Sequence, residues 1–249
     1  MKYVRFNYEG RARYGIVENN YVRLISCEPF SSYKKLNKIN FLESLEILPP
    51  TQPTKVIALG YNYKDLVGQK DQYDEPVIFL KPPSSIIGHN QTIRIPTNSK
   101  VWTEVELAIV IGKQGSNIPI ENAESYIFGY TIGNDVTMSN ILNRDHHLAR
   151  SKCLDTFCPL GPIIVTDFDI KSKKLANEIN DKISQESNTR NMILNNKEIV
   201  SLVSSFMTLL PGDIILTGTP ANAENSIIKS GDTVKVSIQG LGELVNKVI

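Results

Sequence analysis

The segment between positions 101 and 162 places three acidic residues and a lysine among mostly apolar neighbours. Its first part, VWTEVELAIVIGK, is rich in β-branched residues, which predicts a strand. Strand side chains alternate between two faces, so Glu104 and Glu106 share a face with Ala108 and Val110. Two like charges side by side are unfavourable on a face that turns apolar, unless water or a cation neutralises them. A metal ion would resolve this conflict.

The Glu-x-Glu pair has two interpretations, a solvated strand edge or part of a metal site. A third carboxylate favours the metal site, because YIFGYTI predicts a second strand that ends at Gly133-Asn134 and leaves Asp135 at its mouth. Three carboxylates without a nearby Cys or His pair suit Mg²⁺, Mn²⁺ or Ca²⁺ better than zinc. The candidate metal ligands are therefore Glu104, Glu106 and Asp135.

Length and composition exclude several classes of protein. With 249 residues, a net charge of +1 and 41% hydrophobic residues, the chain fits one large domain or one domain with a small appendage. The 27 basic and 26 acidic residues are balanced and form no arginine-rich run, so we expect no nucleic-acid partner. The apolar runs LAIVI and VIFL are too short to cross a bilayer, so we expect a cytoplasmic protein without a membrane partner. Its three cysteines form neither a zinc motif nor a disulfide framework.

The chain predicts two domains with a boundary near residue 50. Residues 1–27 alternate between apolar and polar and contain Gly and Asn-Asn turns, which indicates a small β-meander. We expect a short helix over Lys34–Leu45, followed by the proline-rich linker ILPPTQPTK. The predicted domains are a small N-terminal β-rich unit over 1–50 and a catalytic unit over 51–249.

The catalytic unit reads as mostly strands. KVIALGYNY and PVIFLKPPSSIIG predict extended structure, and the polar insert KDLVGQKDQYDE between them is either a lid or a plain surface connection. A one-sided helix is expected to start near Thr137. His146 and His147 fall late on it and are either solvated or catalytic.

The remaining segments complete an α+β, mostly β fold. PIIVTDFDI predicts a strand, DKISQESNTRNMIL a polar turn, NKEIVSLVSSFMTL a helix and the tail two strands around Gly240. The strand PGDIILTGTP ends in a loop at Gly218 and Thr219 that can present N–H groups and a hydroxyl to a carboxylate. Strands outnumber helices, which favours a roll over a doubly wound sheet.

The order of motifs resembles the fumarylacetoacetate hydrolase family over residues 50–249. The motifs are GYNY, PVIFLKPPSS, EVELAIVIGK, GYTIGNDVT, KCLDTFCPLGP, QESNTRNMI and LLPGDIILTGTP. The resemblance implies a mixed β-sandwich roll that is often dimeric, so we expect a homodimer. The N-terminal meander is similar to the small leading domain of the family's bacterial and archaeal branch.

The resemblance also assigns roles to single residues. It implies that Glu104, Glu106 and Asp135 hold Mg²⁺ or Mn²⁺. Lys152 would be catalytic and point at the substrate beside the metal, while Lys81, Gly218 and Thr219 would bind the substrate, Thr219 at its carboxylate end.

Two family motifs are altered in this chain. Hydrolases of the family resemble one another in a lid of the form NY-x-DH-x-x-E, whose histidine and glutamate activate water. Here NYKDLVGQ places Leu66 and Gln69 at those positions, and neither is a general base. Where many members carry the arginine and glutamine of T-A-R-D-x-Q, this chain has Ser139 and Leu142, which puts in doubt how the far end of the substrate is held.

These features predict a divalent-metal-dependent enzyme acting on a small 2-oxo or 2-hydroxydienoic acid. Isomerisation (tautomerisation) or decarboxylation, as in 2-hydroxyhepta-2,4-diene-1,7-dioate isomerase, is favoured because both need an enolate stabiliser more than an activated water. One alternative is C–C hydrolysis of an acylpyruvate or fumarylacetoacetate type of substrate. The other is a degenerate member that binds a small acid without turning it over.

Overall fold

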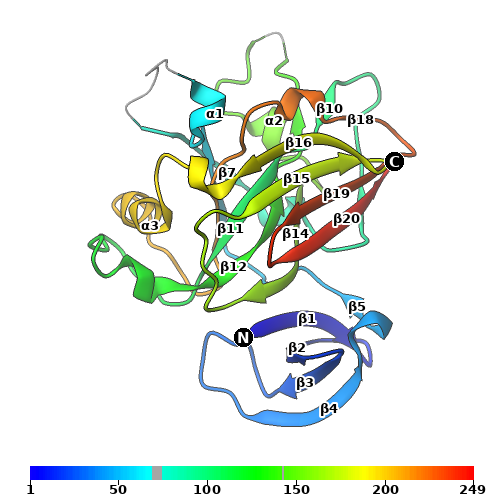
Figure 1. The fold of residues 1–249 in the computed structure, drawn as a ribbon, viewed down its shortest axis with the longest axis vertical. Coiled ribbons are helices and arrows are strands. Elements are labelled where there is room, and N and C mark those ends of the chain that lie inside the picture. Colours follow the sequence, from blue (N-terminus) through cyan, green and yellow to red (C-terminus); the bar gives the residue numbers. More distant parts are fainter. Residues whose placement is uncertain (69–74, 142) are drawn as a thin grey trace.

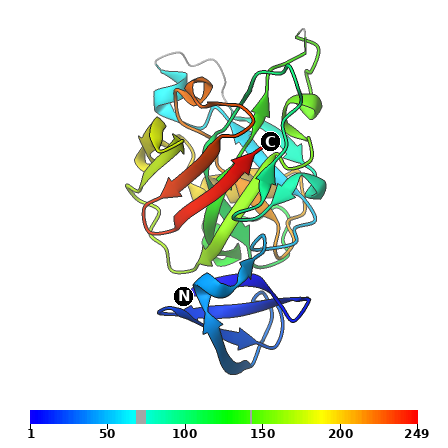
Figure 2. The ribbon, with the colours of Figure 1, turned by 90° about the vertical axis from the view of Figure 1, so that its right-hand side faces the viewer.

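The computed structural model describes residues 1–68, 75–141 and 143–249, with the side chains of residues 38–40 excluded. Strands dominate this part of the chain and its helices are short, which agrees with the predicted mostly-β fold. Figures 1 and 2 show the N-terminal strands at one end and the other elements in a larger body. None of the described helices has the length and apolar character needed to span a membrane.

The N-terminal strands form the predicted meander. Their bounds are β1 (Lys2–Tyr8), β2 (Arg11–Glu18), β3 (Tyr21–Ile25), β4 (Lys35–Phe41) and β5 (Glu46–Ile47). The helix predicted over Lys34–Leu45 is wrong, because β4 pairs with β3 and only the 3₁₀ turn η1 (Leu42–Ser44) follows it. The edge of β3 supplies the backbone hydrogen bonds that make residues 35–41 a strand, and the local sequence pattern does not reveal this partner.

The N-terminal strands continue into the largest sheet of the body. Its other strands are β6 (Val56–Gly60), β7 (Val77–Lys81), β8 (Ile86–Ile87), β11 (Val105–Ile111), β12 (Ile127–Asn134), β14 (Cys158–Val165) and β17 (Ile214–Leu216). The main order is β4-β3-β2-β1-β14-β12-β11-β17-β6-β7, so β1 joins the body through β14. The domain boundary near residue 50 stays a prediction.

Two smaller sheets complete the described strands. One contains β10 (Val101–Trp102), β13 (Thr137–Met138) and β18 (Ile227–Ile228). The other contains β9 (Thr92–Ile93), β15 (Lys174–Ile179), β16 (Lys182–Asn188), β19 (Thr233–Ile238) and β20 (Gly242–Val248). The polar turn predicted over 181–194 is wrong, because β16 pairs along β15 before the turn η4 (Thr189–Asn191).

The helices are α1 (Lys64–Val67), α2 (Ala149–Lys152) and α3 (Asn196–Ser204), and further 3₁₀ turns are η2 (Pro83–Ser85), η3 (Ala123–Tyr126) and η5 (Ala223–Asn225). The sequence predicts α3 correctly, and a capping box of Asn195 and Glu198 begins it. The helix predicted from Thr137 is wrong. Thr137 instead pairs with Trp102 in β10, and Asn140 bonds the backbone N–H of Asp145, so these polar side chains compete with a helix.

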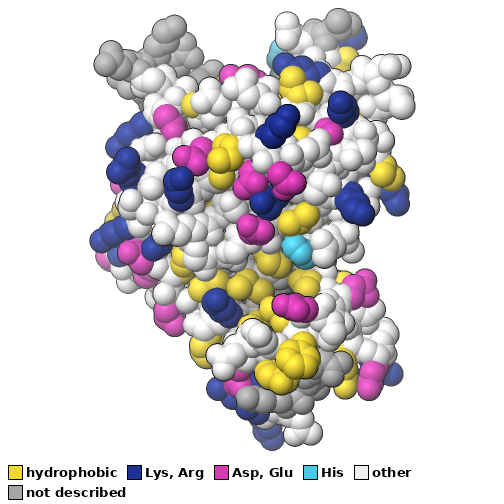
Figure 3. Space-filling model, turned by 45° about the vertical axis from the view of Figure 1, so that its right-hand side comes forward, with side chains coloured by type: hydrophobic (Ala, Val, Ile, Leu, Met, Phe, Trp, Pro, Cys, Tyr) yellow, Lys and Arg dark blue, Asp and Glu magenta, His cyan; other side chains and the backbone are white. Residues whose placement is uncertain are grey.

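The core lies on both faces of β11, all of whose residues are buried. Leu107 and Ile109 belong to one apolar cluster, while Ala108 and Val110 belong to another that reaches the N-terminal strands. Figure 3 shows hydrophobic side chains gathered at the waist between the N-terminal strands and the larger body. The alternation expected for this strand therefore places Glu106 on the face of Ala108 and Val110.

Candidate functional site

Two carboxylates come from the beginning of β11. Glu106 is only 1% exposed and Glu104, just before the strand, is 8% exposed, so the interpretation as a solvated edge is wrong. The indole Nε1 of Trp102 donates to Glu104 Oε1 at 2.7 Å, and the Gly218 N–H donates to Glu106 Oε2 at 2.6 Å. These bonds hold both carboxylates in defined positions.

The third carboxylate, Asp135, follows directly after β12. Because β12 is antiparallel to β11, with Gly133 opposite Glu106, its end lies beside the beginning of β11. The Asp135 N–H donates to the Glu104 carbonyl at 2.9 Å. One carboxylate oxygen from each of the three predicted metal ligands lies within 4.8 Å of the others.

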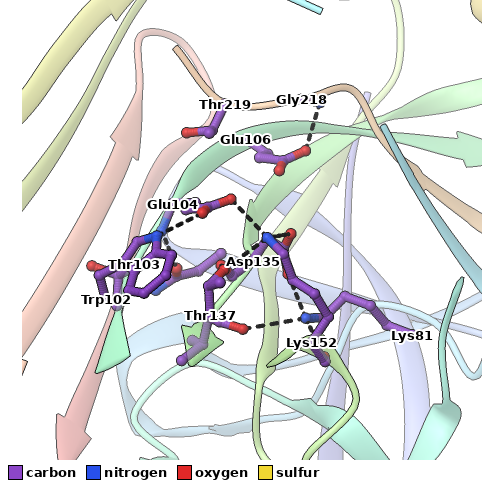
Figure 4. A network of polar contacts seen from close by, with 12 residues as sticks. Lys81, Trp102, Thr103, Glu104, Glu106, Asp135, Thr137, Lys152, Gly218 and Thr219 are labelled. Carbon is purple, nitrogen blue, oxygen red and sulfur yellow. Dashed lines mark hydrogen bonds and ion pairs between the residues drawn. The ribbon is translucent and has the colours of Figure 1, made fainter. Parts of the chain in front are cut away.

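Two buried lysines contact this cluster (Figure 4). Lys152 Nζ lies 2.5 Å from Asp135 Oδ2 and 3.0 Å from Glu104 Oε2, and it donates to Thr137 Oγ1 at 2.7 Å. Lys81 Nζ is paired with Asp135 Oδ1 and donates to the Lys152 carbonyl at 2.6 Å. Asp135 thus lies between two ammonium groups.

The pKa values of Glu106 and Asp135 are shifted in opposite directions. Burial, reinforced by Asp135 and Glu104, raises the pKa of Glu106 well above its usual value. Burial alone would also raise the pKa of Asp135, but Lys152 and Lys81 hold it below its usual value. Burial would lower the pKa of Lys152, yet Asp135 and Glu104 keep it raised, so Lys152 is an ammonium at neutral pH. Of Glu106 and Asp135, Glu106 is therefore the carboxylate whose ionised form is disfavoured.

A cavity of about 320 Å³ opens beside the cluster. Its polar lining includes Glu104, Asp135, Thr137, Lys152 and Thr219. Its apolar lining is formed by Leu59, Leu66, Val77, Phe79, Trp102, Met138, Leu148 and Ala223. Its volume is at the lower end of the range for small-molecule pockets, which suits a small acid.

Two of the residues predicted to bind substrate, Lys81 and Gly218, are not in the lining of the cavity and contact the carboxylate cluster instead. Lys81 is not among its lining residues, contrary to expectation, because its ammonium is engaged by Asp135 and by carbonyls behind it. The Gly218 N–H is directed at Glu106 and not into the cavity. A side chain at Gly218, where φ is +99°, would lie 3.0 Å from Asn62 Cβ, so glycine is needed here.

Thr219 lines the cavity, and its predicted contact with the substrate stays a prediction. Its hydroxyl contacts the Val105 carbonyl at 3.2 Å and accepts a bond from Gln185 Nε2 at 3.0 Å. Gln185 is buried and also donates to the Pro220 carbonyl at 2.8 Å. The sequence analysis missed Gln185, because the segment that contains it was expected to be a turn.

Asp145 is a second residue that the sequence analysis missed. Its carboxylate accepts the backbone N–H groups of Arg150 at 3.1 Å and Ser151 at 2.6 Å, and the Ser151 hydroxyl at 2.6 Å. These groups belong to the single turn of α2 that ends at Lys152. An aspartate just before a short helical run is the signal that would have found it.

One residue of the altered family motifs lies at the cavity. Leu66, on α1, lines it, whereas Gln69 and Leu142 fall outside the described residues. Ser139 and the exposed residues His146 and His147 are not among the described lining residues. The described lining therefore contains no imidazole that could act as a base.

Comparison with known proteins gives a consistent set of matches. The family model described as "Fumarylacetoacetate (FAA) hydrolase C-terminal" matches residues 55–249, and one described as "Rv2993c-like, N-terminal" matches residues 1–50. The oxaloacetate tautomerase Fahd2a, mitochondrial, of Rattus norvegicus is 39% identical over 82% of this chain and 69% of its own length.

Solved structures are similar over the whole chain. The crystal structure of 2-hydroxyhepta-2,4-diene-1,7-dioate isomerase from Mycobacterium marinum has a TM-score of 0.91 and 38% identity, covering 100% of this chain and 98% of its own. Maleylpyruvate hydrolase from Sphingobium sp. SYK-6, in complex with manganese(II) ion and pyruvate, has a TM-score of 0.81 and 26% identity, covering 100% and 99%.

Proposed function

Since the chain belongs to the fumarylacetoacetate hydrolase family, we propose that it is a divalent-metal-dependent tautomerase of a small 2-oxo acid. The observation that carries this proposal is the cluster of three carboxylates, of which Glu104 and Asp135 line one cavity together with Lys152. Relatives named as a tautomerase and an isomerase support it.

The residues present fit a divalent cation of the Mg²⁺ or Mn²⁺ type. Glu106 is buried and, among the described residues, it is bonded by the Gly218 N–H and forms no ion pair. When all three carboxylates are ionised, they and the two ammonium groups leave one net negative charge. Burial, followed by the neighbouring carboxylates, raises the pKa of Glu106, and a bound cation would stabilise its ionised form. Carboxylate oxygens are the donors that such hard cations prefer. Glu104, Glu106 and Asp135 would hold the ion.

The roles of the chain's own residues follow from their positions. A bound divalent cation would supply positive charge that stabilises negative charge on substrate oxygens. Lys152 would donate a hydrogen bond to the same oxygens. As an ammonium it would not itself remove the C3 proton, which would pass to Glu224, the carboxylate of the described lining that is not a proposed metal ligand. The Thr219 hydroxyl would contact the carboxylate end of the substrate.

Hydrolysis receives less support from the lining of the cavity. Activating a water molecule needs a group that accepts a proton within hydrogen-bond reach, and Leu66 cannot do this. Decarboxylation shares the enolate chemistry and remains compatible with the same site. Binding without turnover is the remaining alternative, which the following experiment separates from tautomerisation.

The experiment measures hydrogen–deuterium exchange at C3 of 2-oxo acids by NMR in D₂O, with and without Mg²⁺. We expect metal-dependent exchange by the parent and a loss of about 10²-fold in Lys152→Met, because a charged donor at the developing oxyanion is removed. Exchange that survives in Lys152→Met would remove the lysine from the mechanism. The absence of exchange for every acid tested would favour the binding protein.

A further inference from the structure

Among the described residues that line the cavity, no second cationic side chain is present. Lys152 is the single Lys or Arg among the described residues that line it, and its ammonium is already shared by Asp135 and Glu104. Lys100 lies 6.0 Å from the centroid of the Trp102 ring but is not a lining residue. Among the described lining residues, a substrate with two carboxylates would therefore find one cationic side chain for two negative charges.

The net charge of the site also favours a substrate with one carboxylate. With a divalent cation, the one net negative charge of the three carboxylates and two ammonium groups becomes one net positive charge. That surplus balances one substrate carboxylate. Glu224, an exposed acidic residue of the lining, adds negative charge and disfavours a second carboxylate.

The rest of the wall suits an apolar group. Leu66, Phe79 and Met138 come from three separate elements and, with the other apolar residues, form most of the remaining lining, beside the polar side chains of Tyr61, Asn140 and Ser151. An unpaired carboxylate against these side chains would lose its hydration without a compensating hydrogen bond. A hydrocarbon tail would instead gain from leaving water.

We propose that the site is specific for monocarboxylic 2-oxo acids with an uncharged, apolar tail, and that it discriminates against 2-oxo dicarboxylates. This inference rests on the proposed function for the turnover step, while the binding preference can be measured independently of turnover. It separates this chain from relatives whose names refer to dicarboxylates.

The test compares 2-oxopentanoate with 2-oxoglutarate, which differ only in a methyl or a carboxylate at C5. Calorimetric binding to the Mg²⁺-loaded protein and C3 exchange by NMR are both measured. We expect 2-oxopentanoate to bind and exchange at least about tenfold better, since the second carboxylate is desolvated without a partner. Leu66→Arg, on a half-buried helix position, should shift this ratio about tenfold toward 2-oxoglutarate, and Leu66→Met should not.

The outcomes separate this proposal from the proposed function. Equal or better binding and exchange of 2-oxoglutarate would overturn the specificity and leave tautomerisation in place. Preferential binding of 2-oxopentanoate without any exchange would support the specificity and contradict the tautomerase. A ratio that Leu66→Arg leaves unchanged would mean that the tail does not reach this wall, and weak binding of both acids would overturn both proposals.

Discussion

At the scale of single residues, Glu106 is the most informative of the predicted metal ligands. Burial raises the pKa of Glu106, so the neutral amide of Glu106→Gln avoids the cost of a buried charge when no metal is bound. We therefore expect this variant to fold with a similar melting temperature but to lose stabilisation by Mg²⁺ or Mn²⁺. A tenfold weaker metal affinity corresponds to about 1.4 kcal/mol at saturating metal.

Scanning calorimetry with and without the metal measures this difference. Glu186→Gln is the matched control, because Glu186 is an exposed carboxylate on β16 that pairs with Lys174. Metal stabilisation in Glu106→Gln equal to that of the parent would contradict the assignment of the ligands.

Asp145 is expected to be a positioning residue that acts through Lys152. Asp145→Asn replaces a charged acceptor of α2 N–H groups by a neutral one, which should loosen the turn carrying Lys152. The C3 exchange rate should fall about tenfold while stabilisation by Mg²⁺ is retained, since the metal ligands are untouched. Asp155→Asn, at an exposed neighbouring position, should leave both unchanged. Loss of metal stabilisation in Asp145→Asn would indicate a general structural role instead.

At the scale of elements, His89 makes the contact of β20 with the loop after β8 dependent on pH. Its Nδ1 accepts the Val245 N–H at 3.2 Å, which requires an unprotonated nitrogen. Burial lowers the pKa of His89, and Glu243 opposes this shift only in part. A histidine with a lowered folded-state pKa stabilises the fold above its unfolded pKa of about 6.5, and this contribution is lost as the pH falls from that value through the folded-state pKa.

We therefore expect the parent to lose more stability than His89→Asn between pH 7.5 and about pH 5.5. Asparagine can accept the same N–H but does not titrate. Urea unfolding at a series of pH values checks this, with His146→Asn, at an exposed position, as the control that should follow the parent. Parallel pH profiles of the parent and His89→Asn would contradict the role of His89.

At the scale of the whole molecule, β7 supports the predicted homodimer. It forms one end of the largest sheet, and Leu80 on it is 46% exposed while its neighbours Ile78 and Phe79 are only partly buried. An apolar strand at a sheet edge is a surface that proteins usually cover. We expect light scattering to give twice the chain mass of 27.9 kDa.

Leu80→Lys should shift the mass toward that of one chain, because it places a charge in the proposed interface. Ile120→Lys, another exposed apolar position, is the control and should remain dimeric. A parent mass of one chain over a wide concentration range would refute the dimer, and a dimer unaffected by Leu80→Lys would place the interface elsewhere.

The sequence by itself determined the strand-rich class and the local positions of the three carboxylates, two on one strand face and one at the end of the next strand. Both depend on local periodicity: β-branched runs favour strands, and the two-residue repeat puts Glu104 and Glu106 on one face. The break after Asn134 likewise placed Asp135 at a strand end. Such features need no knowledge of distant segments.

Only the tertiary structure decided which groups face the cavity and which support it. The pairing of Lys81 with Asp135 and of the Gly218 N–H with Glu106 joins segments 54 and 112 residues apart. In the same way, the segment around Gln185 forms a strand because it pairs with β15. Hydrogen bonding to a distant strand outweighs a weak local preference for helix or turn. The free-energy cost of leaving a buried polar group unpaired is larger than the contribution of secondary-structure propensity.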